Sequence, residues 1–280
     1  MNYRSLLVLL DDSESCAARV EMAINRARDL DCHLVGLAPT GLVEMGGSSQ
    51  PAPALEEFAA RAWDHLRERA SQAANRFRDE CRVAGLKSYE AVVDEDDKAI
   101  SLVAHAHCSD LVVLSQADAA ARDHRAVRAM VEQVVLHSAR PTLIAPTTGR
   151  FSHVGDRVLV AWNDSREAAR AISDALPILC HSSHVQLVHW RHPEAPDDAA
   201  LRGRLDAAQR WLMWHGVPCE VIVEATELPF GGAMLSRAAA MQADLLVMGA
   251  YGHSLLAERL LGGATHTVLA ASPLPVLMSH

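Results

Sequence analysis

The chain has 280 residues, of which 50% are hydrophobic, and a formal net charge of −9 at pH 7. This length suffices for one large domain or two of about 100–150 residues, and the acidic balance excludes a dedicated nucleic-acid binder, which needs a basic face. No apolar run is long enough to span a membrane. The run from Leu6 to Leu10 is followed by two aspartates and is interpreted as a core strand, not a signal peptide, so we expect a cytoplasmic protein with no membrane partner.

Short apolar segments alternate with helical periodicity through the first half of the chain. The expected strands are Leu6–Leu10, His33–Leu37, Tyr89–Val93, Leu111–Leu114 and Thr142–Ala145. The segment from Thr40 to Glu57 is rich in Gly, Ser and Pro and is predicted to be an extended loop, with a mobile flap over a ligand as the alternative. A turn-rich linker from Pro146 to Arg157 ends this half.

The second half continues the alternation of strands and helices. Its expected strands are Val158–Trp162, Val185–Trp190, Cys219–Ala225, Leu245–Gly249 and Val276–Met278. Its expected helices are Ser165–Leu179, Ala199–His215, Pro229–Gln242 and Gly262–Ala271. Continuous Val/Leu strands that alternate with helices are typical of a doubly wound parallel sheet covered on both faces. Such α/β sheets bind ligands beyond the carboxyl ends of their strands.

Two blocks of the first half recur in the second half. The Asp-Ser pair at 12–13 recurs 152 residues later, each time after an apolar strand and before an Ala-rich helix. The block from Lys98 to Ser115 recurs at an offset of 134, as Gly232 to Gly249. Because two independent blocks keep register, the sequence predicts tandem copies of one domain, at residues 1–148 and 154–280.

Four glycines, Gly249, Gly252, Gly262 and Gly263, surround a helix-like stretch near the end of the chain. Glycine in a regular element costs roughly 0.5–1 kcal/mol relative to alanine, so a compensating role is expected. Backbone N–H groups at a helix start form an anion site when no side chain covers them. The pattern predicts a phosphate cradle, to which Thr265 could add a hydroxyl; the alternative is that the glycines only serve tight turns.

The stretch GAYGHSLLAERLLGGATHTVL, followed by PLPVLM, resembles the universal stress protein family, whose nucleotide-binding members carry G-x2-G-x9-G-[S/T]. Gly249, Gly252 and Gly262 match this spacing, and the resemblance covers nearly the whole chain as two tandem domains. It implies a five-stranded parallel sheet in each domain, of the adenine nucleotide alpha hydrolase-like type. It also implies pairing of the domains through their final strands, and ATP or AMP binding in some members.

The resemblance carries over residue by residue, with departures. Asn163 stands where nucleotide-binding members have an acidic residue near the phosphates and metal, which leaves Mg²⁺ binding open. Gly263 replaces the Ser/Thr after the third glycine, and Thr265 is the substitute hydroxyl. Trp190 lies at the adenine position, where its indole could stack on the base or fill the pocket. The expected nucleotide-binding residues are Ala161, Trp162, Asn163, Trp190, Met248, Gly249, Gly252, Gly262, Gly263, Ala264 and Thr265.

The first half departs further from the family pattern. It keeps the acidic residue as Asp11, but the four glycine positions are occupied by Ser115, Asp118, Arg128 and Ala129. The Asp118 carboxylate would repel phosphates, and side chains would block the backbone cradle. We therefore expect no nucleotide in this half and a structural role instead, through pairing of the strands around Thr142–Ala145 and Val276–Met278.

These patterns predict a stress-response protein of two tandem domains that binds ATP or AMP in its C-terminal domain. The alternative is a scaffold or protein-interaction module without a nucleotide, which the losses at Asn163 and Gly263 favour. No catalytic residue and no metal site are predicted. Since no general base is recognisable, ATP hydrolysis should be weak or absent. A homodimer is left open, and no nucleic-acid partner is expected.

Overall fold

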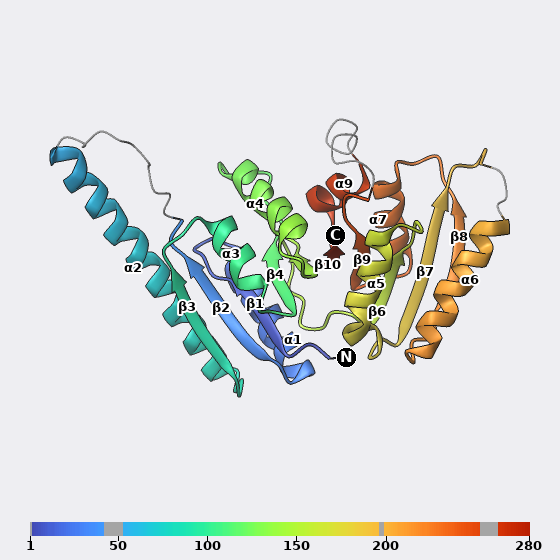
Figure 1. Ribbon diagram of the computed structural model, residues 1–280, viewed down its shortest axis with the longest axis horizontal. Coiled ribbons are helices and arrows are strands. Elements are labelled where there is room, and N and C mark those ends of the chain that lie inside the picture. Colours follow the sequence, from blue (N-terminus) through green and yellow to red (C-terminus); the bar gives the residue numbers. More distant parts are fainter. Residues whose placement is uncertain (1, 42–52, 196–198, 253–262) are drawn as a thin grey trace.

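The computed structural model describes residues 2–41, 53–195, 199–252 and 263–280. In these ranges the strands form one ten-stranded sheet, in the order β3-β2-β1-β4-β5-β10-β9-β6-β7-β8, with helices on both faces (Figure 1). No helix in the described part of the chain is long and apolar enough to cross a membrane.

The first half contributes five mutually parallel strands. They are β1 (Ser5–Leu9), β2 (His33–Pro39), β3 (Tyr89–Asp94), β4 (Leu111–Ser115) and β5 (Thr142–Ala145). Two helices pack on each face: α1 (Cys16–Leu30) and α2 (Pro53–Val83) on one, α3 (Lys98–Ala106) and α4 (His124–His137) on the other. The residues of β4 and β5 and most of those of β1 and β2 are buried on both faces, as the continuous apolar runs predict, whereas β3 at the sheet edge is partly exposed.

The second half repeats this arrangement. Its strands are β6 (Arg157–Ala161), β7 (His184–Arg191), β8 (Glu220–Ala225), β9 (Leu245–Gly249) and β10 (Val276–Ser279), again mutually parallel. Helices α5 (Arg166–Leu179) and α6 (Ala199–Trp214) lie on one face, and α7 (Phe230–Ala240) and α9 (Ala264–Ala271) on the other. The predicted doubly wound, parallel α/β fold is thus confirmed.

The two halves meet where β5 and β10 pair in antiparallel fashion, with Leu277 opposite Leu143. The Gln116 side-chain amide donates to the carbonyl oxygens of Val268 at 3.4 Å and Ser272 at 3.0 Å, which fastens the end of α9 to the first half. The two five-stranded arrays are therefore parts of one continuous sheet.

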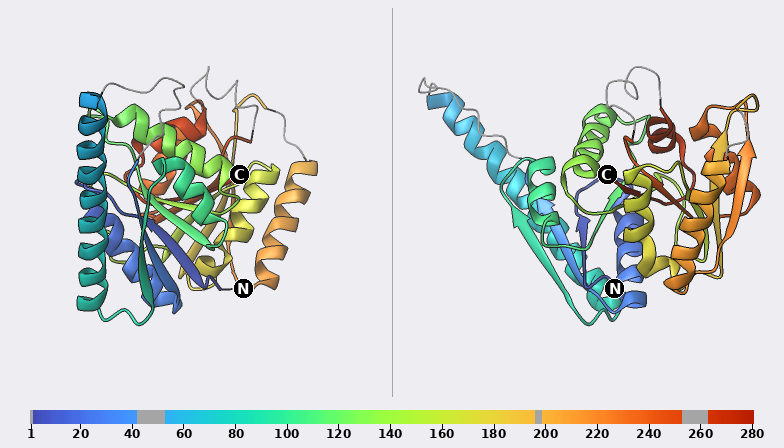
Figure 2. Two further views of the ribbon diagram at one scale, coloured as in Figure 1. Left: turned by 60° about the vertical axis from the view of Figure 1, so that its left-hand side comes forward. Right: turned by 45° about the vertical axis from the view of Figure 1, so that its right-hand side comes forward.

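The predicted loop from Thr40 to Glu57 is wrong at its end, because α2 already begins at Pro53. Proline fits the first turn of a helix, and the Leu, Glu and Ala residues that follow favour helix. Residues 42–52 of that segment lie outside the described residues. The N-terminal part of α2 extends past the sheet, as Figure 2 shows in its right-hand view.

Candidate functional site

The predicted site lies at the carboxyl ends of β6 and β9, which are neighbours in the sheet. The turn after β6 is held by its own polar groups: the Asn163 side-chain oxygen accepts hydrogen bonds from the backbone N–H of Ser165 at 3.3 Å and from its hydroxyl at 2.7 Å. The Ser165 Oγ in turn accepts from the N–H of Ala168 at 3.1 Å and caps α5. Asp164, between them, has a left-handed φ of 60°.

Gly249 and Gly252 both face the start of α5. A Cβ at Gly249 would lie 2.6 Å from the backbone N of Ala168 and 2.6 Å from the carbonyl carbon of Glu167. A Cβ at Gly252 would lie 3.0 Å from Glu167 Oε2 and 3.3 Å from Ser165 Oγ. The first glycine therefore permits a close approach of strand and helix, and the second lies against a carboxylate.

The Glu167 carboxylate was missed by the sequence reasoning. The residue is 3% exposed, and its Oε1 accepts a hydrogen bond from Arg166 Nε. Burial alone would raise its pKa, but hydrogen bonds from Arg166, from its own backbone and from Ser165, together with the Arg166 charge, hold the pKa below the ordinary value. The group beside Gly252 is thus an anion at neutral pH. In the sequence, Glu167 cannot be told from an ordinary acidic residue in the first turn of a helix.

Three of the predicted residues, Ala161, Trp190 and Met248, form an apolar layer with Tyr251 against α7 and α9. All four belong to one buried cluster, in which Trp190 is 6% exposed. Within the described ranges, the Trp190 indole N–H has no hydrogen-bond acceptor. Trp162 packs on the opposite face of the sheet, so the structure does not bring the two indoles together.

The start of α9 supplies the remaining predicted residues. Gly263 is the N-cap and Ala264 the first helical residue, and no side chain caps this end. Thr265 is buried, and its hydroxyl oxygen accepts a hydrogen bond from the backbone N–H of Tyr251 at 3.2 Å. That hydroxyl therefore ties the turn after β9 to α9. Gly262 lies outside the described residues.

The model of the universal stress protein family matches residues 155–280. The Thermus aquaticus "universal stress protein in QAH/OAS sulfhydrylase 3′ region" is 31% identical over 133 residues, covering 43% of this chain and 96% of that relative. The chain belongs to the universal stress protein family. A solved universal stress protein from Archaeoglobus fulgidus DSM 4304 is similar in fold, with a TM-score of 0.75 and 19% identity over 98% of this chain and 95% of that one. A candidate universal stress protein from Pseudomonas aeruginosa UCBPP-PA14 has a TM-score of 0.60 and 18% identity over 99% of this chain and 93% of that one.

In the first half of this universal stress protein, a buried arginine lies at the equivalent strand ends, those of β1 and β4. Arg19 of α1 is 2% exposed. Its guanidinium group donates to the Leu9 carbonyl at 2.9 Å, to Ser115 Oγ at 2.8 Å and to Asp11 Oδ1 at 2.9 Å. Ser115 is the residue aligned with Gly249, so Arg19 occupies the space between the ends of β1 and β4. The sequence reasoning did not single out Arg19.

The Asp11 carboxylate forms an ion pair with this arginine. Burial raises its pKa, but the Arg19 charge and hydrogen bonds from Ser13 and Arg19 outweigh it, so the pKa lies below the ordinary value. The other two side chains expected to obstruct this half have local partners: Asp118 accepts from the N–H of Ala120, and Arg128 pairs with Glu132 one turn along α4. No group of three His, Cys, Asp or Glu residues that could hold a metal occurs in the described part of the chain.

Proposed function

We propose that this universal stress protein binds an adenine nucleotide, ATP or AMP, in its second half, and that it binds ATP as the magnesium complex. The observation that carries the proposal is the ionised Glu167 carboxylate against Gly252. Asn163 lacks the charge that nucleotide-binding relatives use, and Glu167, four residues later, brings a carboxylate to the same turn. The lost negative charge is thereby replaced within the crevice.

In this proposal, ATP binding beside Glu167 requires Mg²⁺. A carboxylate close to a phosphate repels it strongly in a partly buried site. Mg²⁺ is usually held by one or two carboxylates together with substrate phosphates and water, so the donor set of Glu167 and the nucleotide fits this ion. The uncapped N-terminus of α9, at Gly263 and Ala264, would face the phosphates with backbone N–H groups.

The first half takes no nucleotide in this proposal. Arg19, with its three acceptors, fills the space between the ends of β1 and β4, and the Ser115 side chain stands at the Gly249 position. The two halves, residues 1–148 and 154–280, would then be one structural and one ligand-binding domain. We place the protein in the cytoplasm as a ligand-sensing stress-response protein with at most weak ATP hydrolysis.

Calorimetry with ATP, in Mg²⁺ and in EDTA, tests the proposal on the wild type and on Glu167→Gln. The wild type should bind at least tenfold more tightly with Mg²⁺, equivalent to about 1.4 kcal/mol, and Glu167→Gln should lose this difference. Glu227→Gln, an exposed carboxylate of the same half, is the matched control and should behave as the wild type. Gly252→Asp should abolish binding.

The second candidate function is a nucleotide-free scaffold or protein-interaction module. It is favoured by the packing of Trp190 and Tyr251 into the buried layer where an adenine is expected. Absence of ATP binding by both the wild type and Glu167→Gln, with and without Mg²⁺, would decide for this candidate and against the first.

A further inference from the structure

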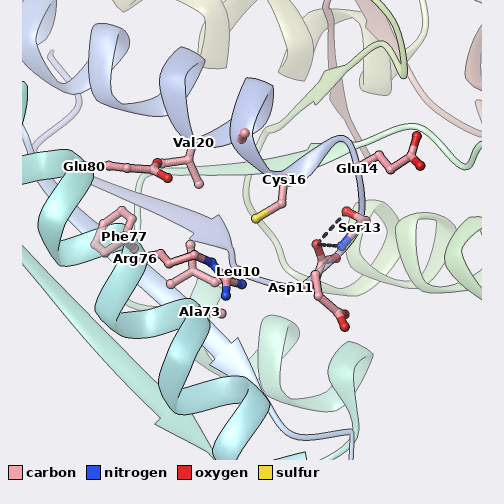
Figure 3. Close-up of a pocket in the computed structure, with 12 residues that line it drawn as sticks. Leu10, Asp11, Ser13, Glu14, Cys16, Val20, Ala73, Arg76, Phe77 and Glu80 are labelled. Atoms are coloured by element: carbon pink, nitrogen blue, oxygen red, sulfur yellow. Dashed lines mark hydrogen bonds between the residues drawn. The ribbon is translucent and has the colours of Figure 1, made fainter.

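A cavity of about 420 Å³ lies in the first half, between the start of α1 and the middle of α2 (Figure 3). Its wall comprises the turn after β1, the first turns of α1 and one face of α2. It lies on the sheet face that α1 and α2 cover, and it shares Asp11 with the Arg19 ion pair. The cavity lies in the first half, whereas the nucleotide is proposed to bind in the second half.

The floor of the cavity is apolar. Leu10, Val20, Ala73 and Phe77 line it, and their exposed fractions are between 1% and 5%. The Cys16 sulfur is directed toward the same space, as Figure 3 shows. A volume of this size is within the range of about 300–1,000 Å³ that small-molecule sites occupy. A hydrocarbon body is the kind of group that gains free energy by leaving water for such a floor.

The rim carries an excess of negative charge. Asp11 and Asp12 belong to it, but each is already paired, with Arg19 and with Arg69 respectively. Glu14 and Glu80 also line the rim, and no ion pair engages either of them in the described part of the chain. Opposing these two carboxylates is one rim cation, Arg76, one helical turn before Glu80. After the internal pairs are set aside, the rim retains a net charge of about −1.

Glu80 lines the cavity, and among the described residues Arg76 is the one cation on the same rim that can offset its charge. Partial burial raises its pKa, and the Arg76 charge offsets that effect only in part. A ligand cation near Glu80 would favour its ionised form. A phosphate or carboxylate ligand would instead meet the acidic rim.

We propose that this cavity binds an organic amine with a hydrocarbon body, the ammonium group at the Glu80 side of the rim and the body on the floor formed by Leu10, Val20, Ala73 and Phe77. Three probes share one body and differ in charge: hexylammonium, hexanol and hexanoate. Binding should weaken in that order. Since a partly exposed charge pair contributes about 0.2–1 kcal/mol, the step from amine to alcohol should be up to about fivefold.

Ligand binding in the cavity can be measured through the rate at which Cys16 is labelled. In a Cys108→Ser/Cys180→Ser background, which removes the two exposed thiols, the rate of maleimide labelling at Cys16 is followed by peptide mass spectrometry. Hexylammonium should slow this labelling in a saturable way and yield an affinity. Hexanoate should have the weakest effect. Equal protection by hexanoate and hexylammonium, or no protection by either, would overturn the proposal.

Variants on the wall separate the two parts of the site. Glu80→Gln should weaken hexylammonium binding by about two- to fivefold without affecting hexanol, and Arg76→Gln should tighten it, because a competing cation is removed. Glu68→Gln, on α2 but outside the cavity, is the matched control. Ala17→Phe, at an exposed alanine of the wall, should block all three probes. Since Glu80 and Ala17 are both exposed, these substitutions should leave the fold intact. Unchanged hexylammonium binding in both Glu80→Gln and Ala17→Phe would therefore refute the assignment.

Discussion

Arg19 shows how a single side chain differentiates the two halves. Its guanidinium group takes three acceptors from the ends of β1 and β4, and the ion pair with Asp11 is largely withdrawn from water. A buried charge is tolerated when it is paired and hydrogen-bonded, and Ser115 supplies one of the three acceptors. At the aligned position, Gly249 has no side chain to offer, and the second half places the Glu167 carboxylate beside Gly252 instead.

Asp11 should make stability depend on acid pH. Its folded pKa is below the unfolded value of about 3.9, so the stabilisation is complete above that value and is lost as the pH falls through the folded pKa. Asp11→Asn should lower the free energy of unfolding at pH 7 and flatten its decline below about pH 5. Urea titrations from pH 2.5 to 7 measure this. Asp123→Asn, whose exposed side chain makes no capping hydrogen bond, is the control, and a decline in Asp11→Asn as steep as in the wild type would contradict the prediction.

At the scale of elements, the contact between β9 and α5 depends on one glycine. Gly249→Ala would place a methyl group 2.6 Å from the α5 backbone, which cannot move away as a side-chain end can. We expect a loss of about 1–3 kcal/mol in the free energy of unfolding. Gly252→Ala meets only side-chain atoms, Glu167 Oε2 at 3.0 Å and the Ser165 side chain at 3.3 Å, so it should cost less than Gly249→Ala. Urea unfolding of the pair decides the matter; equal losses would show that the close approach of β9 to α5 is not the cause.

The same contact shows where sequence reasoning reaches its limit. The strands were predictable because runs such as Leu111–Leu114 are apolar without a break, which indicates a strand buried on both faces. The glycine spacing located the turn after β9 correctly, at the end of that strand. It did not reveal that Gly249 packs on α5 or that Glu167 lies against Gly252, since both depend on the distance between elements far apart in the chain. The start of α2 at Pro53 was missed because the Gly, Ser and Pro residues of Thr40–Glu57 all fall at or before Pro53, and the segment after it is helix-forming.

The whole molecule is organised around the junction of β5 and β10. This pair is antiparallel and lies at the centre of the sheet, with helices over both faces (Figure 1). Leu143 and Leu277 face each other across it and are both fully buried. If the halves were separated, each would present a hydrophobic edge strand with unpaired backbone groups, which promotes association with other chains. We infer that the junction couples the stability of the two halves.

Leu143→Ala tests this coupling. Removing a fully buried leucine side chain costs about 2–5 kcal/mol, and the loss should reach the second half although the residue belongs to the first. Tryptophan fluorescence reports mainly on the second half, which holds four of the five tryptophans, and pulsed labelling of the buried Cys81 reports on the first. In the wild type the two probes should give one urea midpoint, and in Leu143→Ala both midpoints should fall together. A fall in the Cys81 midpoint alone would mean that the halves unfold independently despite their common sheet.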